Sequence, residues 1–161
     1  MIDLESRLAE LKGRLPSMPV STADSDKINY ARDLYPLTQI RMQHGRVGRR
    51  PRAVVWPGGP AEVAEVARWA SAAGVALIPY GAGSGVCGGT QVEGEAVIVD
   101  LKRMNRVLDL DEKSLLVRVQ PGVMGEDLER WLNRRGYTLG HFPSSIYCSS
   151  VGGWLAARSA G

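Results

Sequence analysis

Hydrophobic residues near the start of this chain follow a helical period and then lose it. Leucines recur every three or four positions from Leu4 to Leu15, and a proline then ends the pattern. This spacing predicts a short amphipathic helix that begins at Ile2. Residues 20–40 are only weakly periodic, which is typical of a loop region with a turn of helix near Ser25–Leu34.

The middle of the chain alternates apolar runs with a helical pattern. Val54–Trp56 predicts a buried strand, and Pro60–Ala73 predicts a helix that Gly74 caps. The apolar run Val75–Ile78 predicts a second strand, which Pro79 stops. Strand, helix and strand in this order predict a βαβ unit with parallel strands and a right-handed crossover.

The second half of the chain predicts further strands and two more helices. Ala96–Leu101 predicts another buried strand, and Arg106–Leu110 and Leu115–Gln120 predict a hairpin. Met124–Arg135 predicts an amphipathic helix, and a helical pattern returns at Trp154–Arg158. The expected fold class is therefore α+β, with a small parallel βαβ sheet lobe flanked by helices and with hairpin strands.

The composition is that of a folded domain with many loops. Apolar residues make up 44% and charged residues 23% of the 161 residues, and 19 glycines favour a loop-rich protein with strands over an all-helical one. Twenty basic and 17 acidic side chains give a net charge of +3, which is too small to indicate a nucleic-acid binder. No apolar window is long enough to span a membrane, so we expect a soluble cytoplasmic protein in a reducing compartment.

Two groups of residues, one basic and one of cysteines and histidines, do not by themselves indicate a binding site. The basic run RMQHGRVGRRPR (41–52) holds five arginines without an interleaved aromatic residue, so we interpret it as solvated surface, with a phosphate contact as the alternative. Cys87, Cys148, His44 and His141 have neither the spacing of a metal site nor that of a disulfide framework. We therefore expect no metal.

The stretch VALIPYGAGSGVCGGT (75–90) holds five glycines after its apolar run. Bare main-chain N–H groups at this density form a concave anion site, so we expect a phosphate-bearing cofactor here. Gly83, Gly85 and Gly88 satisfy G-x-G-x-x-G, but residues 89–95 are too few for the crossover helix of a nicotinamide site. The sequence therefore predicts a main-chain cradle without a helix dipole behind it.

Five segments carry a family resemblance when they are taken together in chain order. They are PRAVVWP (51–57), IPYGAGSGV (78–86), VDLKRMNRVLDLD (99–111), VQPGVMGEDLERWL (119–132) and GHFPSSIYCSSVGGWLAARSAG (140–161). These segments resemble the FAD-binding domain of the vanillyl-alcohol oxidase and p-cresol methylhydroxylase (PCMH) superfamily, and look closest to its alkylglycerone-phosphate synthase and glycolate or D-lactate dehydrogenase branches. The resemblance implies a first lobe of a PCMH-type FAD-binding domain over residues 51–161, after an N-terminal helix and basic extension over residues 1–50.

The same resemblance implies two sets of FAD-binding residues. The loop expected to wrap the FAD pyrophosphate comprises Pro79, Tyr80, Gly81, Ala82, Gly83, Ser84 and Gly85. The segment expected to approach the flavin and diphosphate from the other side comprises Pro143, Ser144, Ser145, Ser149, Ser150, Gly152 and Gly153, with Ala156 and Ser159 closing that side. Glycine N–H groups and serine hydroxyls suit a diphosphate because they supply many donors in little space.

Departures from the family bear on how the flavin is held. Relatives with covalently bound flavin often place a histidine in the first glycine loop, and residues 81–89 contain none, so we expect FAD to be non-covalent. Cys148 is similar in position to a cysteine that forms a second flavin link in berberine-bridge-like members, but we prefer the interpretation as a small buried cysteine. His141 lies either near the isoalloxazine or in an ordinary loop, and Arg158 either pairs with phosphate or caps a helix.

The resemblance implies a flavin-dependent oxidoreductase that oxidises a 2-hydroxy acid such as glycolate or D-lactate. An alkylglycerone-phosphate synthase-like flavoenzyme is one alternative, and a non-catalytic fragment or nucleotide-binding module is another. In the family, the substrate and the catalytic side chains belong to a further C-terminal domain, so we expect this chain to be a fragment that holds part of a flavin site. The sequence identifies no catalytic residue, and it leaves a homo-oligomer open.

Overall fold

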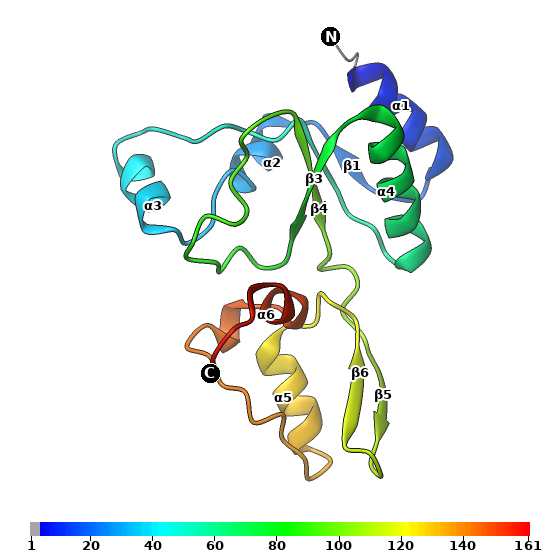
Figure 1. Cartoon of the computed structure of the whole chain (residues 1–161), viewed down its shortest axis with the longest axis vertical. Coiled ribbons are helices and arrows are strands. Elements are labelled where there is room, and N and C mark those ends of the chain that lie inside the picture. The colour runs from blue at the N-terminus through cyan, green and yellow to red at the C-terminus, as the bar shows by residue number, and fades with distance from the viewer. Residues whose placement is uncertain (1–3) are drawn as a thin grey trace.

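The computed structural model, which describes residues 4–161, has two lobes stacked along its long axis (Figure 1). The upper lobe contains a four-stranded sheet in the order β1-β2-β4-β3, and the lower lobe contains a two-stranded sheet. The strands of the upper sheet are β1 (Val20–Ser21), β2 (Ala53–Val55), β3 (Ala76–Tyr80) and β4 (Ala96–Asp100). The mixture of helices and strands confirms the α+β class.

Strand β4 lies between the two strands of the predicted βαβ unit. It pairs in parallel with β2 on one side and with β3 on the other, so that Ile98 lies opposite both Val54 and Ile78. All five residues of β4 are buried, which is typical of a parallel strand that is covered on both faces. The prediction that the strands of the unit are parallel is therefore confirmed, although they are not neighbours in the sheet.

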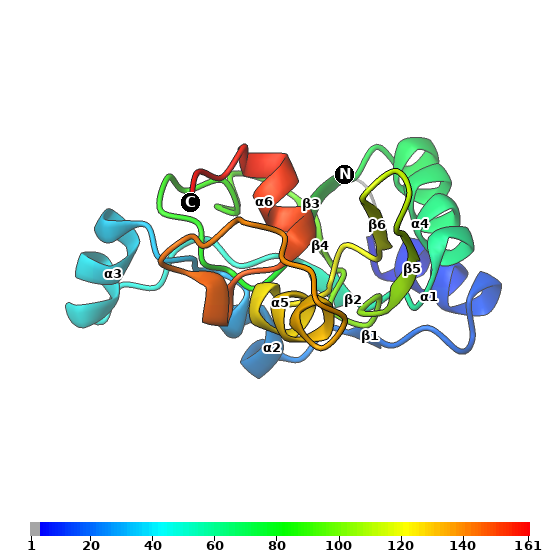
Figure 2. The ribbon, with the colours of Figure 1, turned by 90° about the horizontal axis from the view of Figure 1, so that it is seen from below.

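Side chains of the sheet alternate between two cores. The first core contains Ala53, Val55, Val97 and Val99 beneath the helices α1 (Leu4–Arg14) and α4 (Pro60–Ala73). Trp69 of α4 is buried in it, and its Nε1 donates to the Arg7 carbonyl of α1 over 2.8 Å. The second core, on the other face, contains Val54, Tyr80, Val92, Ala96 and Ile98. Figures 1 and 2 show α1 and α4 side by side at one end of the upper lobe.

The segment predicted as a loop between residues 20 and 40 is more ordered than expected. It contains β1 and the two short helices α2 (Asp24–Asn29) and α3 (Pro36–Gln43), and α3 projects at the end of the lobe opposite α1 and α4 (Figure 2). Helix α2 overlaps the turn of helix predicted near Ser25–Leu34, whereas β1 and α3 were not predicted, because elements this short carry little periodic signal. Strand β1 is specified by its antiparallel pairing with β2, which is a tertiary contact.

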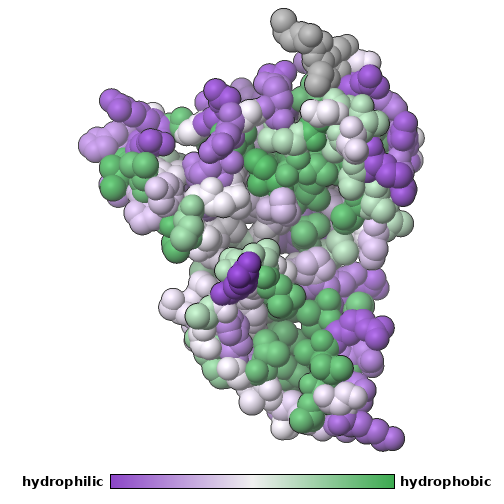
Figure 3. Space-filling model, viewed as in Figure 1, coloured by the Kyte–Doolittle hydropathy of each residue, from purple (hydrophilic) through white to green (hydrophobic). Residues whose placement is uncertain are grey.

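The lower lobe packs two helices against a hairpin. Its strands are β5 (Val107–Asp111) and β6 (Leu116–Val119), and its helices are α5 (Gly125–Asn133) and α6 (Val151–Ala157), with a 3₁₀ turn η1 (Ile146–Cys148) between the helices. The core of this lobe contains Val123, Leu128, Leu132, Val151 and Trp154. Leu108, Leu115 and Leu116 of the hairpin are exposed. The space-filling view shows apolar surface on this lobe (Figure 3).

Two sequence expectations are corrected here. Pro79 does not stop β3 but lies inside it, opposite Val99, because β3 is an edge strand where a missing N–H costs no ladder hydrogen bond. Helix α6 begins at Val151 rather than Trp154, so Gly152 and Gly153 form its first turn and not a separate loop. The Ser150 hydroxyl caps this helix, and a cap of that kind offsets the low helix propensity of two glycines.

Other expectations are confirmed. Helix α4 has the predicted bounds and ends at Gly74, whose φ of +66° is the left-handed cap conformation. The hairpin β5–β6 and helix α5 lie where they were predicted within a few residues, whereas the predicted helix start at Ile2 lies outside the described residues. None of the helices within residues 4–161 has the length and apolar character needed to cross a bilayer.

Candidate functional site

The glycine loop that leaves the carboxyl end of β3 has unused hydrogen-bond donors. Residues 81–95 contain no helix and no strand, as the short gap to β4 predicted. Within the part of the chain that the structure describes, no backbone N–H from Ala82 to Thr90 donates a hydrogen bond. Because unpaired backbone donors need a partner, these N–H groups are free to bind water or an anionic ligand.

The loop is held in shape from below by Tyr80. Gly83 has φ of +72°, and a Cβ at this position would overlap the Tyr80 hydroxyl. That hydroxyl donates to the Arg32 carbonyl over 3.1 Å, and the Tyr80 ring packs edge-on against Tyr30 at 4.7 Å. Tyr80 is therefore a buried support for the loop, and its phenol does not face solvent.

The second predicted segment is organised by side-chain hydrogen bonds of its own. Ser149 is buried, and its hydroxyl donates to the Ser145 carbonyl and accepts from Trp154 Nε1, both over 2.7 Å. The Ser150 hydroxyl accepts from the Gly153 N–H over 3.3 Å. These contacts give both serine hydroxyls structural partners within the lower lobe.

The two predicted segments meet at Gly81 and Ser150. A Cβ on Gly81 would overlap the Ser150 hydroxyl, so the absence of a side chain allows the upper loop to contact the cap of α6. Pro143 is buried below this contact, whereas Ser144, Gly153 and Ala156 are exposed. The structure thus brings together one residue from each set, and leaves several members of the second set at the surface.

A cavity of about 230 Å³ lies beside the glycine loop. Its lining includes Tyr80, Ala82, Gly83 and Ser84 of the predicted loop, and Asn29, Arg32, Asp33, Leu34 and Cys148 from elsewhere. Cys148, interpreted as a buried cysteine, is in fact exposed, because it ends the short η1 turn at the surface. No described histidine, cysteine, aspartate or glutamate belongs to a cluster that could hold a metal.

Arg32 and Asp33 are site residues that sequence reasoning missed. Asp33 is 2% exposed, and its Oδ1 accepts from the Tyr35 N–H over 3.0 Å and from Gln91 Nε2 over 3.2 Å. Its Oδ2 is buried and has no hydrogen-bond partner in residues 4–161. The only signal in the sequence is a charged pair in a weakly periodic stretch, and only the fold brings that pair to the cavity beside the glycine loop.

Ionisable groups lie beneath the loop, at the end of β4. Asp100 is fully buried and accepts from the Tyr30 hydroxyl, from the Lys102 N–H over 2.8 Å and from Lys102 Nζ over 2.5 Å. Burial, followed by the hydrogen bond to Asp100, raises the pKa of the Tyr30 phenol, and burial also raises the pKa of the Tyr80 phenol. Both phenols are therefore neutral donors at physiological pH.

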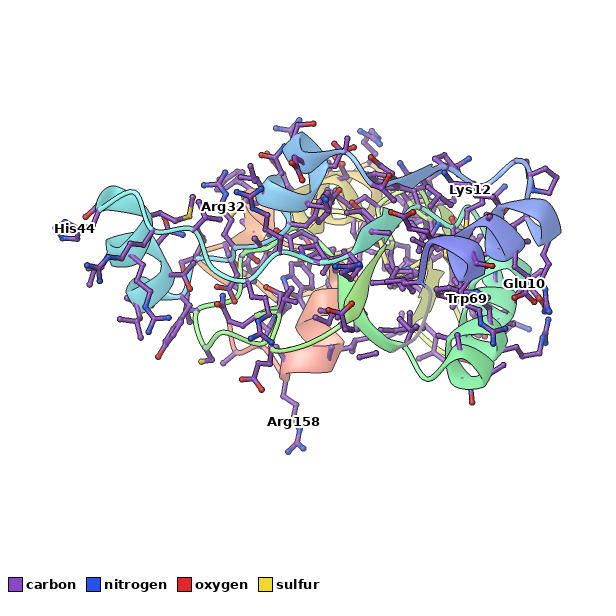
Figure 4. The ribbon with its side chains drawn as sticks, turned by 90° about the horizontal axis from the view of Figure 1, so that it is seen from above. Glu10, Lys12, Arg32, His44, Trp69 and Arg158 are labelled. Carbon is purple, nitrogen blue, oxygen red and sulfur yellow. The ribbon has the colours of Figure 1, made fainter. Side chains whose placement is uncertain are left out.

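The sequence left the roles of His141 and Arg158 undecided, and the structure shows the surroundings of both. The His141 ring packs edge-on against Trp154 at 4.7 Å, and its Nε2 is buried without a hydrogen-bond partner in the described chain. Arg158 ends α6 with φ of +49° and is exposed, and its side chain points away from the body of the molecule (Figure 4). Its backbone thus caps the helix, and its side chain does not face the cavity.

Sequence comparisons identify similar proteins. The family described as an FAD binding domain matches residues 51–161. The alkyldihydroxyacetonephosphate synthase of Caenorhabditis elegans is 36% identical over 126 residues, which cover 76% of this chain and 21% of that protein. The glycolate oxidase subunit GlcD of Bacillus subtilis is 33% identical over 111 residues, which cover 69% of this chain and 24% of that protein. The chain thus spans between a fifth and a quarter of the length of these curated relatives.

Solved structures agree with this result. A structure of alkyldihydroxyacetonephosphate synthase aligns with a TM-score of 0.90 and 32% identity, covering 98% of this chain and 30% of that chain. A structure of p-cresol methylhydroxylase aligns with a TM-score of 0.74 at 15% identity, covering 98% of this chain and 30% of that chain, and supports the fold alone. The resemblance to the vanillyl-alcohol oxidase and p-cresol methylhydroxylase superfamily is confirmed.

Proposed function

We propose a function from the premise that the chain belongs to the FAD binding domain family and that its cofactor is FAD. The chain supplies the diphosphate-binding part of the FAD site in a flavin-dependent enzyme. The observation that carries this proposal is the row of unpaired N–H groups from Ala82 to Thr90, whose first three residues line a cavity of about 230 Å³. A diphosphate is rich in acceptor oxygens, so it complements donors that the fold itself leaves without partners.

The residues around the cavity fit this role. The N–H groups of Ala82, Gly83 and Ser84 are donors for phosphate oxygens, and Arg32 adds a positive charge at the edge of the cavity. The unpartnered Oδ2 of Asp33 accepts hydrogen bonds only, so it suits a hydroxyl of the cofactor rather than its phosphates. The predicted residues Pro79, Gly81 and Gly85 shape the loop, and Ser150 supports it from the lower lobe.

FAD, when bound, supplies the electron-accepting chemistry of such an enzyme. The residues of this chain bind and orient FAD. The glycine loop holds the diphosphate, and the buried Tyr80 prevents the loop from moving into the space below it. We assign no proton transfer to this chain. Substrate binding and the catalytic side chains belong to further sequence in this proposal, because the matched relatives are several times longer.

For the substrate, we favour an alkylglycerone-phosphate synthase-like reaction. The support is that alkyldihydroxyacetonephosphate synthases combine 36% identity to the chain with a structural match over 98% of it. The name of these relatives describes a product with an alkyl group and a phosphate. Oxidation of a 2-hydroxy acid such as glycolate or D-lactate is the second candidate, and the 33% identity to a glycolate oxidase subunit supports it.

Two measurements test the proposal. Titration of the chain with FAD, FMN and riboflavin should give tight binding of FAD alone, because only FAD contains the diphosphate and adenosine. Equal affinity for FMN, or no binding of FAD, would contradict the diphosphate assignment. A protein that carries this chain with its adjoining sequence should then be assayed for alkyldihydroxyacetone phosphate formation and for dye reduction by glycolate or D-lactate. Turnover in one assay decides between the two candidates.

A further inference from the structure

Lys102 lies directly beneath the start of the glycine loop, and nothing in the family resemblance assigned it a role. It follows β4, and its Nζ donates to the Gly81 carbonyl over 2.9 Å and to Asp100 Oδ2 over 2.5 Å. The same ammonium lies 5.3 Å and 5.1 Å from the ring centroids of Tyr30 and Tyr80. Four groups, on Tyr30, on the consecutive residues Tyr80 and Gly81, and on Asp100, therefore surround one charge, which restricts the rotamers that Lys102 can adopt.

The hydrogen bond to the Gly81 carbonyl fixes the orientation of a peptide unit. A trans peptide is planar, so its C=O and N–H point in opposite directions. With the Gly81 carbonyl directed at Lys102, the Ala82 N–H of the same unit is directed away from Lys102 and Asp100. The Ala82 N–H has no acceptor in the described chain, and Ala82 lines the cavity.

Glycine makes this orientation dependent on an external anchor. Gly81 has no side chain that would limit its backbone, and its packing against Ser150 restrains its position but supplies no donor for its carbonyl. If this peptide turned over, its carbonyl oxygen would replace the Ala82 N–H beside the cavity and would repel a phosphate. The Lys102 ammonium is the donor that the structure provides against this flip.

Charge supports the same role. Asp100 is fully buried beneath the loop, and its negative charge would disfavour a diphosphate nearby. The Lys102 ammonium pairs with this carboxylate, and its side chain remains 41% exposed. Lys102 thus neutralises the carboxylate of Asp100 that lies beneath the loop.

We infer that Lys102 is a positioning residue that holds the Gly81–Ala82 peptide with its N–H presented to the diphosphate of FAD. This inference rests on the proposed diphosphate site, because that site gives the presented N–H its ligand. The orientation of the peptide can nevertheless be measured in the chain without FAD. The test therefore has one readout that depends on the cofactor and one that does not.

The first experiment compares Lys102→Met, Lys102→Arg and the matched control Lys113→Met, which removes the same charge from the exposed hairpin turn. FAD titration should show a dissociation constant about tenfold higher for Lys102→Met, because one charge-assisted anchor of the loop is lost. Lys102→Arg should retain most of the affinity, and Lys113→Met should match the unmodified chain. Equal affinities for Lys102→Met and Lys113→Met would overturn the inference.

A double variant guards against simple misfolding. Lys102→Met alone leaves the buried Asp100 carboxylate without its cationic partner, so the fold itself can fail. Asp100→Asn combined with Lys102→Met removes both charges and should restore the melting temperature toward that of the unmodified chain. FAD affinity should remain low in this double variant, because the Gly81 carbonyl still lacks its donor. Recovery of full affinity there would show that charge balance alone matters, and would overturn the positioning role.

The second experiment uses NMR of the chain without FAD. The carbonyl ¹³C resonance of Gly81 and the amide resonance of Ala82 should both move in Lys102→Met and in the double variant, because they report the two ends of one peptide unit. Both should stay in place in Lys113→Met. Unmoved resonances would overturn the inference even if FAD binding weakened. Moved resonances in a chain that does not bind FAD would support the peptide orientation and contradict the proposed function alone.

Discussion

The two glycine-bearing segments of this protein use the same residue type in different ways. In the upper loop, N–H groups from Ala82 to Thr90 have no acceptor within the described residues. At the start of α6, the N–H groups of Val151 and Gly152 donate to the Val123 and Pro121 carbonyls, both over 2.9 Å. The donors of the upper loop are therefore available to a ligand, whereas these two donors in the first turn of α6 already form hydrogen bonds within the protein.

The space around the glycines shows the same difference. A Cβ on Gly152 would lie 2.6 Å from the Cβ and 2.8 Å from the carbonyl oxygen of Pro121, so this glycine permits close packing. A Cβ on Gly85 would approach only Asp33 Oδ2, at 3.9 Å, so this glycine leaves open space in front of the chain. The number of glycines in a stretch of sequence does not distinguish a binding loop from a packing contact. The structure distinguishes them, because it shows whether the N–H groups are hydrogen-bonded and whether a Cβ would have room.

The largest expected effect is a loss of stability when Gly152, the glycine that permits close packing, is substituted. Gly152→Ala should lower the free energy of unfolding by about 1–3 kcal/mol, because the new methyl group overlaps the backbone of Pro121, which cannot move freely. Urea unfolding measures this change as a lower midpoint. Gly153→Ala is the control, since its Cβ would meet only the Ser150 hydroxyl at 3.3 Å. Equal midpoints for the two variants would contradict the assignment of Gly152 to packing.

A smaller effect is expected on FAD affinity when Gly85 of the upper loop is substituted. Gly85→Ala should raise the dissociation constant for FAD about tenfold, or about 1.4 kcal/mol, because a methyl group then occupies the approach to the free donors. Its free energy of unfolding should change by less than about 0.5 kcal/mol, since nothing in the fold is displaced.

The matched control for this prediction is Gly94→Ala, which lies outside the row of unpaired donors and where a Cβ meets no atom within 4 Å. Calorimetric titration with FAD should give this variant the affinity of the unmodified chain. Gly83 is less suitable for the test, because its φ of +72° and its contact with Tyr80 would disturb the loop in any variant. Unchanged affinity in Gly85→Ala would place the diphosphate elsewhere.

The smallest effect concerns pH. Burial raises the pKa of the Tyr30 phenol above the 10.0 of an exposed tyrosine, so the folded protein keeps this proton more tightly than the unfolded chain does. The corresponding stability is complete below about pH 10 and is lost as the pH rises through the higher pKa of the folded state. The free energy of unfolding from urea titrations should therefore fall above about pH 10, by about 1 kcal/mol or less because solvent screens this half-buried group.

Tyr30→Phe isolates this contribution. The variant loses the hydroxyl that donates to Asp100 and accepts from Trp56 Nε1, so it should be slightly less stable at neutral pH. Its midpoint should then fall less steeply above about pH 10 than that of the unmodified chain. Tyr80 remains in both proteins, and burial raises the pKa of its phenol too, so only the difference between the two curves is interpreted. Identical slopes would mean that Tyr30 ionises equally in both states.

Sequence predicted the elements that carry a strong local signal. Helix α4 has a proline at its start, an apolar face and a glycine cap, and β4 is a run of four apolar residues that ends in Asp100, so both were found within a residue. Strand β1 and helix α3 were missed, because two and eight residues leave little room for a period. Their positions depend on contacts with residues far along the chain.

The same limit applies to the site. The glycine loop is a local signal, and the family resemblance added Ser150 on the far side of the chain. Arg32 and Asp33 reach the loop only through the tertiary fold, and the Lys102 hydrogen bond to the Gly81 carbonyl depends on the pairing of β3 with β4. The contribution of such residues to the site depends on their distances in the folded structure. The spacing of residues along the sequence does not give these distances.

The place of β4 between β2 and β3 also determines when the cradle can form during synthesis. Strands β2 and β3 emerge from the ribosome first, but each needs Ala96–Asp100 as its parallel partner. The anchor of the Gly81 carbonyl comes two residues later still, at Lys102, and the serine that meets Gly81 is residue 150. The glycine loop is therefore synthesised early and reaches its final shape only after Ser150 has been translated.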